Sequence, residues 1–156
     1  MCAKPVQGHG KTLAVNKKAR FQYYVTDTLE CGIELKGTEV KSIKTGKFSF
    51  SDSYAKIENN EIWLVALHIS LYDFGNIHNH QPERIRKLLA HRQEIVRLRR
   101  KIIEKGLTLI PLRFYLVKGL VKVEIGVCKG KQLHDKRDTI KNRDMRRDSD
   151  REFKIR

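Results

Sequence analysis

Two parts of the chain alternate apolar and polar residues with a period of two, which is the pattern of half-buried β-strands. The clearer one covers residues 107–127, on both sides of a turn at Lys118-Gly119. A second pair of strands is predicted for Phe48–Ile57 and Ile62–Ile69. Residues 58–61 join them, and their asparagine pair tolerates the positive φ of a hairpin turn. The sequence therefore predicts two β-hairpins.

A seven-residue repeat between these hairpins predicts a helical insertion over residues 82–105. Pro82 stands at a first-turn position, and Gly106 provides a C-terminal stop. Periodicity alone leaves open whether the insertion is one helix or two short helices that meet near Ala90-His91. We expect its apolar face to pack on the sheet. Two sets of apolar residues recur along that face: Leu88, Ile95 and Ile102, and Leu89, Val96 and Ile103.

Shorter signals complete a fold class that is mainly β with helices. Aromatic and β-branched residues predict short strands within Arg20–Val25 and Cys31–Leu35. Val40 and Ile43, three residues apart and bracketed by glycines, predict a short helix. About six short strands with mostly hairpin connections favour a small closed antiparallel β-barrel with packed helices. The oligonucleotide-binding barrel is the commonest barrel of this kind.

The charge of the chain points to a polyanionic partner. Lysine and arginine number 33 against 18 acidic residues, so the formal net charge is +15 and the sequence pI is about 9.9. Nucleic acid is the first candidate for such a partner. Within residues 83–105, nine basic residues face three acids, so the exposed side of the predicted insertion is strongly positive.

Membrane insertion and disulfide frameworks are not indicated by the sequence. There is no run of eighteen apolar residues and no apolar block near Met1 long enough for a signal peptide, so we expect a cytoplasmic protein without a membrane partner. Cys2, Cys31 and Cys128 lie far apart and form no C-x-x-C motif. We expect them to be reduced and structural, with Cys31 and Cys128 inside strands.

The two ends of the chain differ from its middle, residues 16–128, where the predicted RNA-binding domain lies. Residues 1–15 show no periodicity and are expected to form a flexible arm. Residues 129–156 hold 11 basic and 6 acidic residues with few large apolar ones, so this tail is expected to be disordered alone. Charge spacing nevertheless favours a helix once a partner binds the basic stripe. That stripe comprises Lys136, Ile140, Arg143, Arg147 and Arg151.

Candidate catalytic and metal-binding motifs are weak. His134 and Asp135 are neighbours on the charged tail, where no supporting structure would hold a catalytic geometry; the alternatives are a solvated tail or an RNA-contacting element. His78 and His80 form an H-x-H motif without a third ligand at a recognisable spacing. Ser51-Asp52-Ser53 is interpreted as strand or turn hydrogen bonding. There is no P-loop or G-x-G-x-x-G motif, so no nucleotide cofactor is indicated.

Glu30 is an acid in a basic neighbourhood that includes Asn16 and Arg20. A carboxylate that faced RNA would repel phosphates, so it would have to accept hydrogen bonds from base amino groups or orient an arginine such as Arg20. The alternative is an ordinary intramolecular ion pair, and residue chemistry alone favours it.

Taken together, the motifs of this chain resemble the small protein B (SmpB) family, whose members are also called SsrA-binding or transfer-messenger RNA (tmRNA)-binding proteins. The resemblance covers nearly the whole chain after residue 15. It is carried by the ordered combination of NKKARFQY, GTEVKS, SDSYA, PERIRKLL and GKQLHDKR. This combination is far more specific than any of its parts.

The resemblance implies an oligonucleotide-binding barrel that serves trans-translation, the rescue of bacterial ribosomes stalled on messages without a usable stop codon. Members of the family bind the tRNA-like domain of tmRNA and, with elongation factor Tu, help to deliver alanyl-tmRNA to the empty decoding site. The tail then enters the vacant messenger channel and folds there as a helix. The resemblance implies neither an enzyme nor a cofactor, and we expect a monomer.

The resemblance also assigns roles to residues of this chain. Phe21 and Gln132 depart from the pattern of many relatives, which carry histidine and lysine there. The residues expected to contact tmRNA are Asn16, Arg20, Glu30, Arg84, Arg86, Lys87, Lys129 and Lys131. Those expected at the decoding centre are His134, Asp135, Lys136 and Arg137, and those in the channel are Lys141, Arg143 and Arg147.

Two rival functions remain open at the level of the sequence. A ribosomal protein or general RNA chaperone with the same barrel would bind unrelated structured RNAs equally well. A nuclease would use His134, or the His78 and His80 pair, and would lose its activity when those histidines were replaced.

Overall fold

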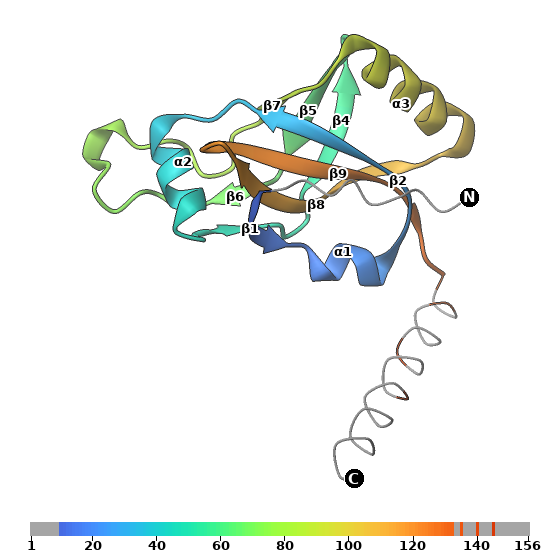
Figure 1. Cartoon of the computed structure of the whole chain (residues 1–156), viewed down its shortest axis with the longest axis horizontal. Helices are drawn as coiled ribbons and strands as arrows, with labels where there is room; N and C mark the ends of the chain where they lie inside the picture. The colour runs from blue at the N-terminus through green and yellow to red at the C-terminus, as the bar shows by residue number, and fades with distance from the viewer. Residues whose placement is uncertain (1–9, 133–134, 136–139, 141–144, 146–156) are drawn as a thin grey trace.

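The computed structural model of the chain describes residues 10–132 together with residues 135, 140 and 145. Its main feature is an antiparallel sheet of seven strands in the order β1-β8-β4-β5-β7-β2-β9, in which β8 also pairs with β9. The pairings of β8, β4, β5, β7, β2 and β9 therefore form a ring, and β1 is attached to it through β8 (Figure 1). The strands of this sheet are β1 (Lys11–Val15), β2 (Tyr23–Ile33), β4 (Tyr54–Glu58), β5 (Glu61–Val65), β7 (Arg86–Leu89), β8 (Thr108–Val117) and β9 (Leu120–Gly130).

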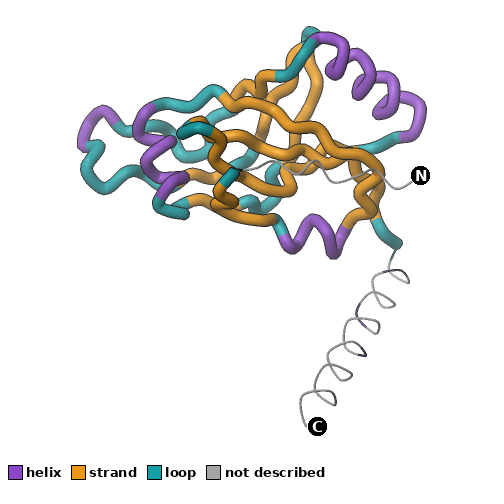
Figure 2. Tube along the Cα trace, in the orientation of Figure 1, coloured by secondary structure: helices purple, strands orange, loops and turns teal. Residues whose placement is uncertain are grey.

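The helices lie around the outside of the strands. In Figure 2, α2 and α3 lie toward opposite ends of the strand assembly, and α1 lies along one side of it. Among the described residues, no helix is long and apolar enough to cross a membrane. The helices are α1 (Lys17–Gln22), α2 (Gly37–Lys44), the single 3-10 turn η1 (Asn76–His78) and α3 (Arg92–Lys105).

Both predicted hairpin turns are confirmed by their backbone conformations. Asn59 and Asn60 have φ values of 51° and 60° between β4 and β5, and Lys118 and Gly119 have 49° and 82° between β8 and β9. Two consecutive residues with positive φ match the right-handed twist of the strands that they join. The predicted short helix is also present, as α2.

The strands predicted over Phe48–Ile57 and Ile62–Ile69 are each interrupted. Phe48–Ser49 forms β3, which pairs with β6 (His68–Ile69) as a separate two-stranded ribbon. A turn at Phe50–Ser53 leads into β4, and the Ser53 amide donates to the Phe50 carbonyl over 2.9 Å. The turn is anchored because the Phe50 ring packs against those of Phe48 and Phe114, each with centroids 5.5 Å away.

The prediction of helix throughout residues 82–105 is wrong for its first part. Arg86–Leu89 is strand β7, which pairs with β5 and β2 inside the ring, and the helix begins only at Arg92. Leu88 is 2% exposed whereas Leu89 is 53% exposed, which is the period of a strand. The helix ends as predicted, because Gly106 adopts the left-handed conformation with φ 57°.

Residues 11–15 also differ from the expected flexible arm. They form β1, whose backbone pairs with β8 from Lys11 opposite Leu116 to Val15 opposite Arg113. Leu13 packs against the main core, which adds apolar contact to the backbone pairing. A segment with little periodicity of its own is thus ordered by the strand beside it. The expectation for residues 1–9 lies outside the described residues.

The core fills the inside of the ring. Its fully buried side chains include Leu64 from β5, Phe114 from β8 and Ile125 from β9. Cys31 in β2 and Cys128 in β9 are buried free thiols, as predicted from their strand contexts. Burial, with the nearby Glu94 and Glu30 carboxylates, raises the pKa of Cys31 to about 12, and burial raises that of Cys128 to about 11. Neither thiol is set up as a nucleophile.

Candidate nucleic-acid interface

Asn16 fixes helix α1 to the sheet. Its side-chain Oδ1 accepts from the Ala19 amide over 2.9 Å as an N-cap, and its Nδ2 donates to the Pro111 carbonyl over 3.0 Å. Its own amide donates to the Leu112 carbonyl over 2.7 Å. Asn16 is only 8% exposed, so its observed role is to position α1.

The exposed face of α1 is basic. Ala19 is buried in a small cluster with Ile110, Leu112 and Cys128 on the outside of the ring, and this contact seats the helix on β8 and β9. The lysines and the arginine of α1 point away from this cluster and are exposed. They are Lys17, Lys18 and Arg20.

The end of β9 adds two more cations next to α1. The Lys131 amide donates to the Gln22 carbonyl over 3.0 Å, and its Nζ donates to the Arg20 carbonyl over 3.3 Å. The same Nζ lies 4.6 Å from the centroid of the Tyr24 ring, within cation–π distance. Lys129 lies opposite Tyr24 in the register of β2 and β9. We call this set of cations the basic surface; it comprises Lys17, Lys18, Arg20, Lys129 and Lys131.

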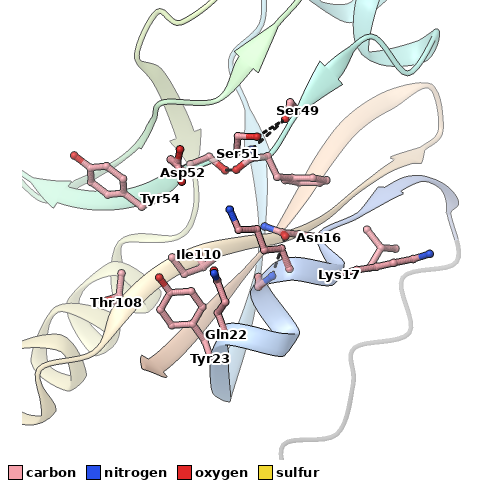
Figure 3. A pocket seen from close by; sticks show the side chains of 15 residues that line it. Asn16, Lys17, Gln22, Tyr23, Ser49, Ser51, Asp52, Tyr54, Thr108 and Ile110 are labelled. Atoms are coloured by element: carbon pink, nitrogen blue, oxygen red, sulfur yellow. Dashed lines mark hydrogen bonds between the residues drawn. The ribbon is translucent and has the colours of Figure 1, made fainter. Parts of the chain in front are cut away.

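A cleft of about 500 Å³ opens beside the basic surface, between α1 and the segment Ser49–Tyr54 (Figure 3). Lys17, Gln22 and Tyr23 lie on the α1 side of it, and Ser49, Ser51, Asp52 and Tyr54 on the other. Thr108 and Ile110 from β8 complete the lining. The cleft therefore combines cations, aromatic rings and hydrogen-bonding groups, which is the mixture that proteins use for single-stranded RNA.

Glu30 lies on β2 and is bound to its own protein. Its carboxylate accepts from Lys122 of β9, and the Tyr115 hydroxyl lies beside it. The hydrogen bond from Lys122, together with the nearby Tyr115 hydroxyl, outweighs partial burial and holds the pKa of Glu30 below its ordinary value. The intramolecular ion pair that residue chemistry favoured is present, although its partner is Lys122 rather than Arg20.

The three basic residues of PERIRKLL occupy different environments. Arg86 is fully buried, and its guanidinium donates to Glu39 over 2.8 Å, to the Leu67 carbonyl over 2.6 Å and to the Pro82 carbonyl over 2.8 Å. Arg84 joins Glu39 through two bonds of 2.9 and 2.6 Å. Direct RNA contact by Arg86 is therefore a wrong prediction, because its side chain has no exposed surface and its donors are occupied.

Glu39 is the centre of this network. It is fully buried, and although burial raises its pKa, hydrogen bonds from Arg84, the Lys36 amide and Arg86 bring the net pKa below the ordinary value. Burial lowers the pKa of Arg86, but the contact with Glu39 keeps the pair charged. The network ties α2 to the segment that enters β7.

Lys87 is partly exposed on the ring. It is ion-paired with Glu61, and its Nζ lies 5.9 Å from the centroid of the Trp63 ring. The Lys87 side chain is 33% exposed and can therefore reach a ligand, so contact between Lys87 and RNA stays a prediction.

Most of the predicted tail contacts lie outside the described residues: His134, Lys136, Arg137, Lys141, Arg143 and Arg147. Asp135 is described, and its Oδ2 accepts from the Gln132 amide over 3.2 Å, next to the end of β9.

The H-x-H motif does not form a metal site. His80 is 2% exposed; its Nδ1 lies 2.9 Å from Thr38 Oγ1, and its Nε2 lies 3.1 Å from the Ile69 carbonyl. His80 is therefore a structural residue. Within the described part of the chain, no group of three or more histidine, cysteine or acidic side chains could hold a metal ion.

The basic surface thus unites Arg20 with Lys129 and Lys131, which lie more than a hundred residues further along the sequence. The model of a protein family described as SmpB protein matches residues 13–155. The chain belongs to the SmpB family. It is 55% identical over 94% of its length to the SsrA-binding protein of Treponema denticola, 95% of which is covered. The SsrA-binding protein of Borreliella burgdorferi is 51% identical, over 91% of this chain and 95% of the relative.

A solved structure supports the family assignment at the level of the fold. One chain of the structure named "tmRNA-SmpB: a journey to the center of the bacterial ribosome" is similar with a TM-score of 0.66 and 45% sequence identity. The match covers 77% of this chain and 85% of that chain. The ring with its attached helices is thus an architecture of the SmpB family.

Three features of the interface were missed at the level of the sequence. Lys17 and Lys18 directly follow the N-cap Asn16, and this NKK pattern could have marked an exposed basic helix start. Tyr24 and Asp52 carry no comparable signal. Their places beside Lys131 and in the cleft depend on strand register and on the turn at Phe50–Ser53.

Proposed function

We propose that this protein is a tmRNA-binding factor of trans-translation. The observation that carries the proposal is the 55% identity, over nearly its whole length, to a protein named SsrA-binding protein. The chain would bind the tRNA-like domain of tmRNA and bring it to stalled ribosomes. It would supply binding and positioning, without a catalytic step, a cofactor or a second copy of itself, and it would act in the cytoplasm.

The body of the protein would supply the tmRNA contact. The ring of six strands is an oligonucleotide-binding barrel in this proposal, and closure of the ring through β8 and β9 supports it. Arg20, Lys129 and Lys131 are exposed or half-buried on the basic surface, so they are available to phosphates. Asn16 would act indirectly, by holding α1. Glu30, Arg84 and Lys87 lie outside the basic surface and remain proposed contributors.

The tail would supply the ribosome contact. In this proposal His134, Asp135, Lys136 and Arg137 meet the decoding centre, and Lys141, Arg143 and Arg147 line the vacant messenger channel. Elongation factor Tu would take part indirectly, through alanyl-tmRNA. The tail begins next to α1, because the Lys131 amide, three residues before His134, donates to the Gln22 carbonyl at the end of that helix.

A competition experiment tests the tmRNA proposal. The full chain is titrated with labelled tRNA-like domain of tmRNA, and unlabelled RNAs of the same length compete for it. We expect the tRNA-like domain to compete at least tenfold better than a structured RNA of unrelated sequence. Equal competition would support a general RNA chaperone, and cleavage of the RNA that depends on His134 or His78 would support a nuclease.

A truncation before His134 tests the division between body and tail. We expect the truncated chain to bind the tRNA-like domain with nearly full affinity and to fail in tagging on stalled ribosomes. Loss of tmRNA affinity in the truncated chain would contradict the division. A second variant, a chain of full length in which only Lys141, Arg143 and Arg147 are replaced by glutamine, should likewise bind the tRNA-like domain and lose tagging.

A further inference from the structure

Asp52 is an acid without a cationic partner in the cleft beside α1. The buried or half-buried acids of the ring are neutralised by a neighbouring base. Asp52 is exposed at the mouth of the cleft and has neither an ion pair nor a side-chain hydrogen bond among the described residues. Lys17 and Lys18 line the same cleft, but neither is ion-paired with Asp52. The acids that do have partners include Asp27 with Lys101, Glu30 with Lys122, Glu39 with Arg84 and Arg86, Glu61 with Lys87, and Glu124 with Arg113.

The backbone holds Asp52 firmly in place. Asp52 has a φ of 53° at the third position of the turn Phe50–Ser53, which both the amide and the hydroxyl of Ser53 close by donating to the Phe50 carbonyl. Phe50 in turn packs against Phe114 in the core. Figure 3 shows Asp52 on the wall of the cleft beside Tyr54, with α1 across from it. The carboxylate is thus presented by a rigid turn.

The charges around the cleft indicate which part of an RNA each of its sides can bind. The protein carries a net charge of +15, and Lys17 and Lys18 favour a phosphate at one side of the cleft. A carboxylate at the other side repels phosphates. It contributes to RNA binding by accepting hydrogen bonds, either from donors on a base edge or from a ribose 2′-hydroxyl. Glu30 was the acid expected to do this, but its carboxylate is bonded to Lys122.

We propose that the cleft binds one unpaired guanine nucleotide, with Asp52 as the residue that recognises the base. This inference rests on the proposed RNA-binding function and names a site within it. The two oxygens of the Asp52 carboxylate accept from N1–H and the N2 amino group of guanine. The Tyr23 and Tyr54 rings contact the base, and Lys17 and Lys18 contact its phosphates.

Guanine is favoured because of the arrangement of its donors. Its Watson–Crick edge has two adjacent donors, which match the two acceptors of an ionised carboxylate, whereas the other bases have a donor next to an acceptor. The size also fits, because a cleft of about 500 Å³ falls within the range of roughly 300–1,000 Å³ that small-molecule sites occupy. Tyr54 is 41% exposed, so its ring is free to stack on a base.

The substitution Asp52→Asn distinguishes a guanine-binding carboxylate from an ordinary surface acid, because the two predict opposite changes in RNA affinity. If Asp52 is only a surface acid, its loss reduces repulsion of RNA, and affinity for the tRNA-like domain rises or stays unchanged. If Asp52 binds guanine, affinity falls roughly tenfold or more, because the amide opposes one guanine donor with its own NH₂ group. Asparagine tolerates the left-handed conformation, so the turn is preserved. The matched control is Glu83→Gln, which removes the same charge from an exposed residue outside the cleft.

A base-substitution series identifies the contact. Each unpaired guanosine of the tRNA-like domain is replaced in turn by inosine, which keeps N1–H and lacks the N2 amino group. We expect one position at which inosine weakens binding to the natural chain severalfold and leaves binding to the Asp52→Asn chain unchanged. Wild-type or stronger affinity of Asp52→Asn, or equal losses with inosine in both chains, would overturn the proposal.

This result is separable from the tmRNA proposal. If the natural chain prefers the tRNA-like domain to unrelated RNA while Asp52→Asn has no effect, only the guanine site is wrong. If the natural chain shows no preference, the tmRNA proposal itself fails. Tyr54→Leu provides a second variant, which keeps the apolar bulk but removes the aromatic ring, and it should weaken binding severalfold if a base stacks there.

Discussion

At the scale of single residues, burial separates the cations that can meet RNA from those that hold the fold. Arg86 and Lys131 carry the same charge and both belong to motifs of the SmpB family. Arg86 is fully buried and donates to Glu39 and to backbone carbonyls, whereas Lys131 lies at the surface beside Tyr24. The charge of a residue therefore indicates affinity for phosphate, and its exposure decides whether that affinity is used.

Glu30 leads to a prediction about pH and stability. Because Lys122 and Tyr115 lower its pKa in the folded state, its contribution to stability is fully present above the unfolded pKa of about 4.3. That contribution is lost as pH falls through the lower folded-state pKa. We expect Glu30→Gln to be less stable than the natural chain at neutral pH, by no more than about 1 kcal/mol because the pair is partly exposed.

Urea unfolding at a series of pH values between 3 and 7 measures this effect. The difference between the natural chain and Glu30→Gln should shrink as pH falls below the ordinary glutamate pKa. Glu83→Gln controls for the general loss of one negative charge. A difference that stayed constant across the series would mean that the Lys122 pair does not shift the titration of Glu30.

At the scale of elements, the role of Asn16 as the N-cap of α1 leads to a prediction about RNA binding. Replacing Asn16 by alanine removes the N-cap bond to Ala19 and the bond to Pro111, and loss of the cap alone costs about 1 kcal/mol. We expect faster amide hydrogen exchange in α1 and weaker binding of the tRNA-like domain. Asn16→Ser, which keeps a capping oxygen, should restore part of both. A loss of affinity with unchanged exchange in α1 would instead indicate a direct contact.

The strand β7 gives a second prediction at this scale. Leu88→Ala should lower the free energy of unfolding by about 2–5 kcal/mol, because Leu88 is 2% exposed inside the ring. Leu89→Ala should cost less than about 1 kcal/mol, since Leu89 is 53% exposed. Thermal or urea unfolding of the two variants measures the contrast. Similar costs for both would not fit a strand with one inward face.

The same strand explains why a sequence repeat was misleading. Leu88, Ile95 and Ile102 are seven residues apart, and a helix would place them on one face. Leu88 instead reaches the core from β7, where it pairs with Ile62 and Ile33, while Ile95 reaches it from α3. Two different elements bury their apolar residues in the same core. A spacing of seven therefore arose without a continuous helix.

At the scale of the whole molecule, the net charge of +15 predicts that RNA binding depends strongly on salt. The five cations of the basic surface would neutralise several phosphates and release counterions. We expect the logarithm of the affinity for the tRNA-like domain to fall linearly with the logarithm of the salt concentration. Lys131→Gln should reduce the slope by about one unit.

A binding titration by fluorescence anisotropy at several salt concentrations checks this prediction. Arg86→Lys would not serve as a control, because Arg86 is buried in the fold. Lys44→Gln, which removes an exposed cation at the end of α2, is the matched control and should leave the slope unchanged. A flat response of the natural chain would contradict an electrostatic interface.

Much of the fold could be predicted because it depends on local physics. The turns at Asn59-Asn60 and Lys118-Gly119 require residues that tolerate positive φ, and the glycine at 106 ends α3 for the same reason. β1 could not be predicted, since its order comes from pairing with β8 rather than from its own pattern. The split of the strand at Phe50 has a similar cause, because the ring of Phe50 turns into the core.

By itself, the sequence determined the composition, the positive charge, the hairpin turns and the motifs of the family. Only the tertiary structure decided which charged residues are exposed, because exposure depends on which elements pack together. It buried Arg86, paired Glu30 with Lys122, and brought Arg20 and Lys131 together from opposite ends of the chain. It also left Asp52 unpaired in a cleft beside lysines, since the turn that carries Asp52 is held by a phenylalanine in the core.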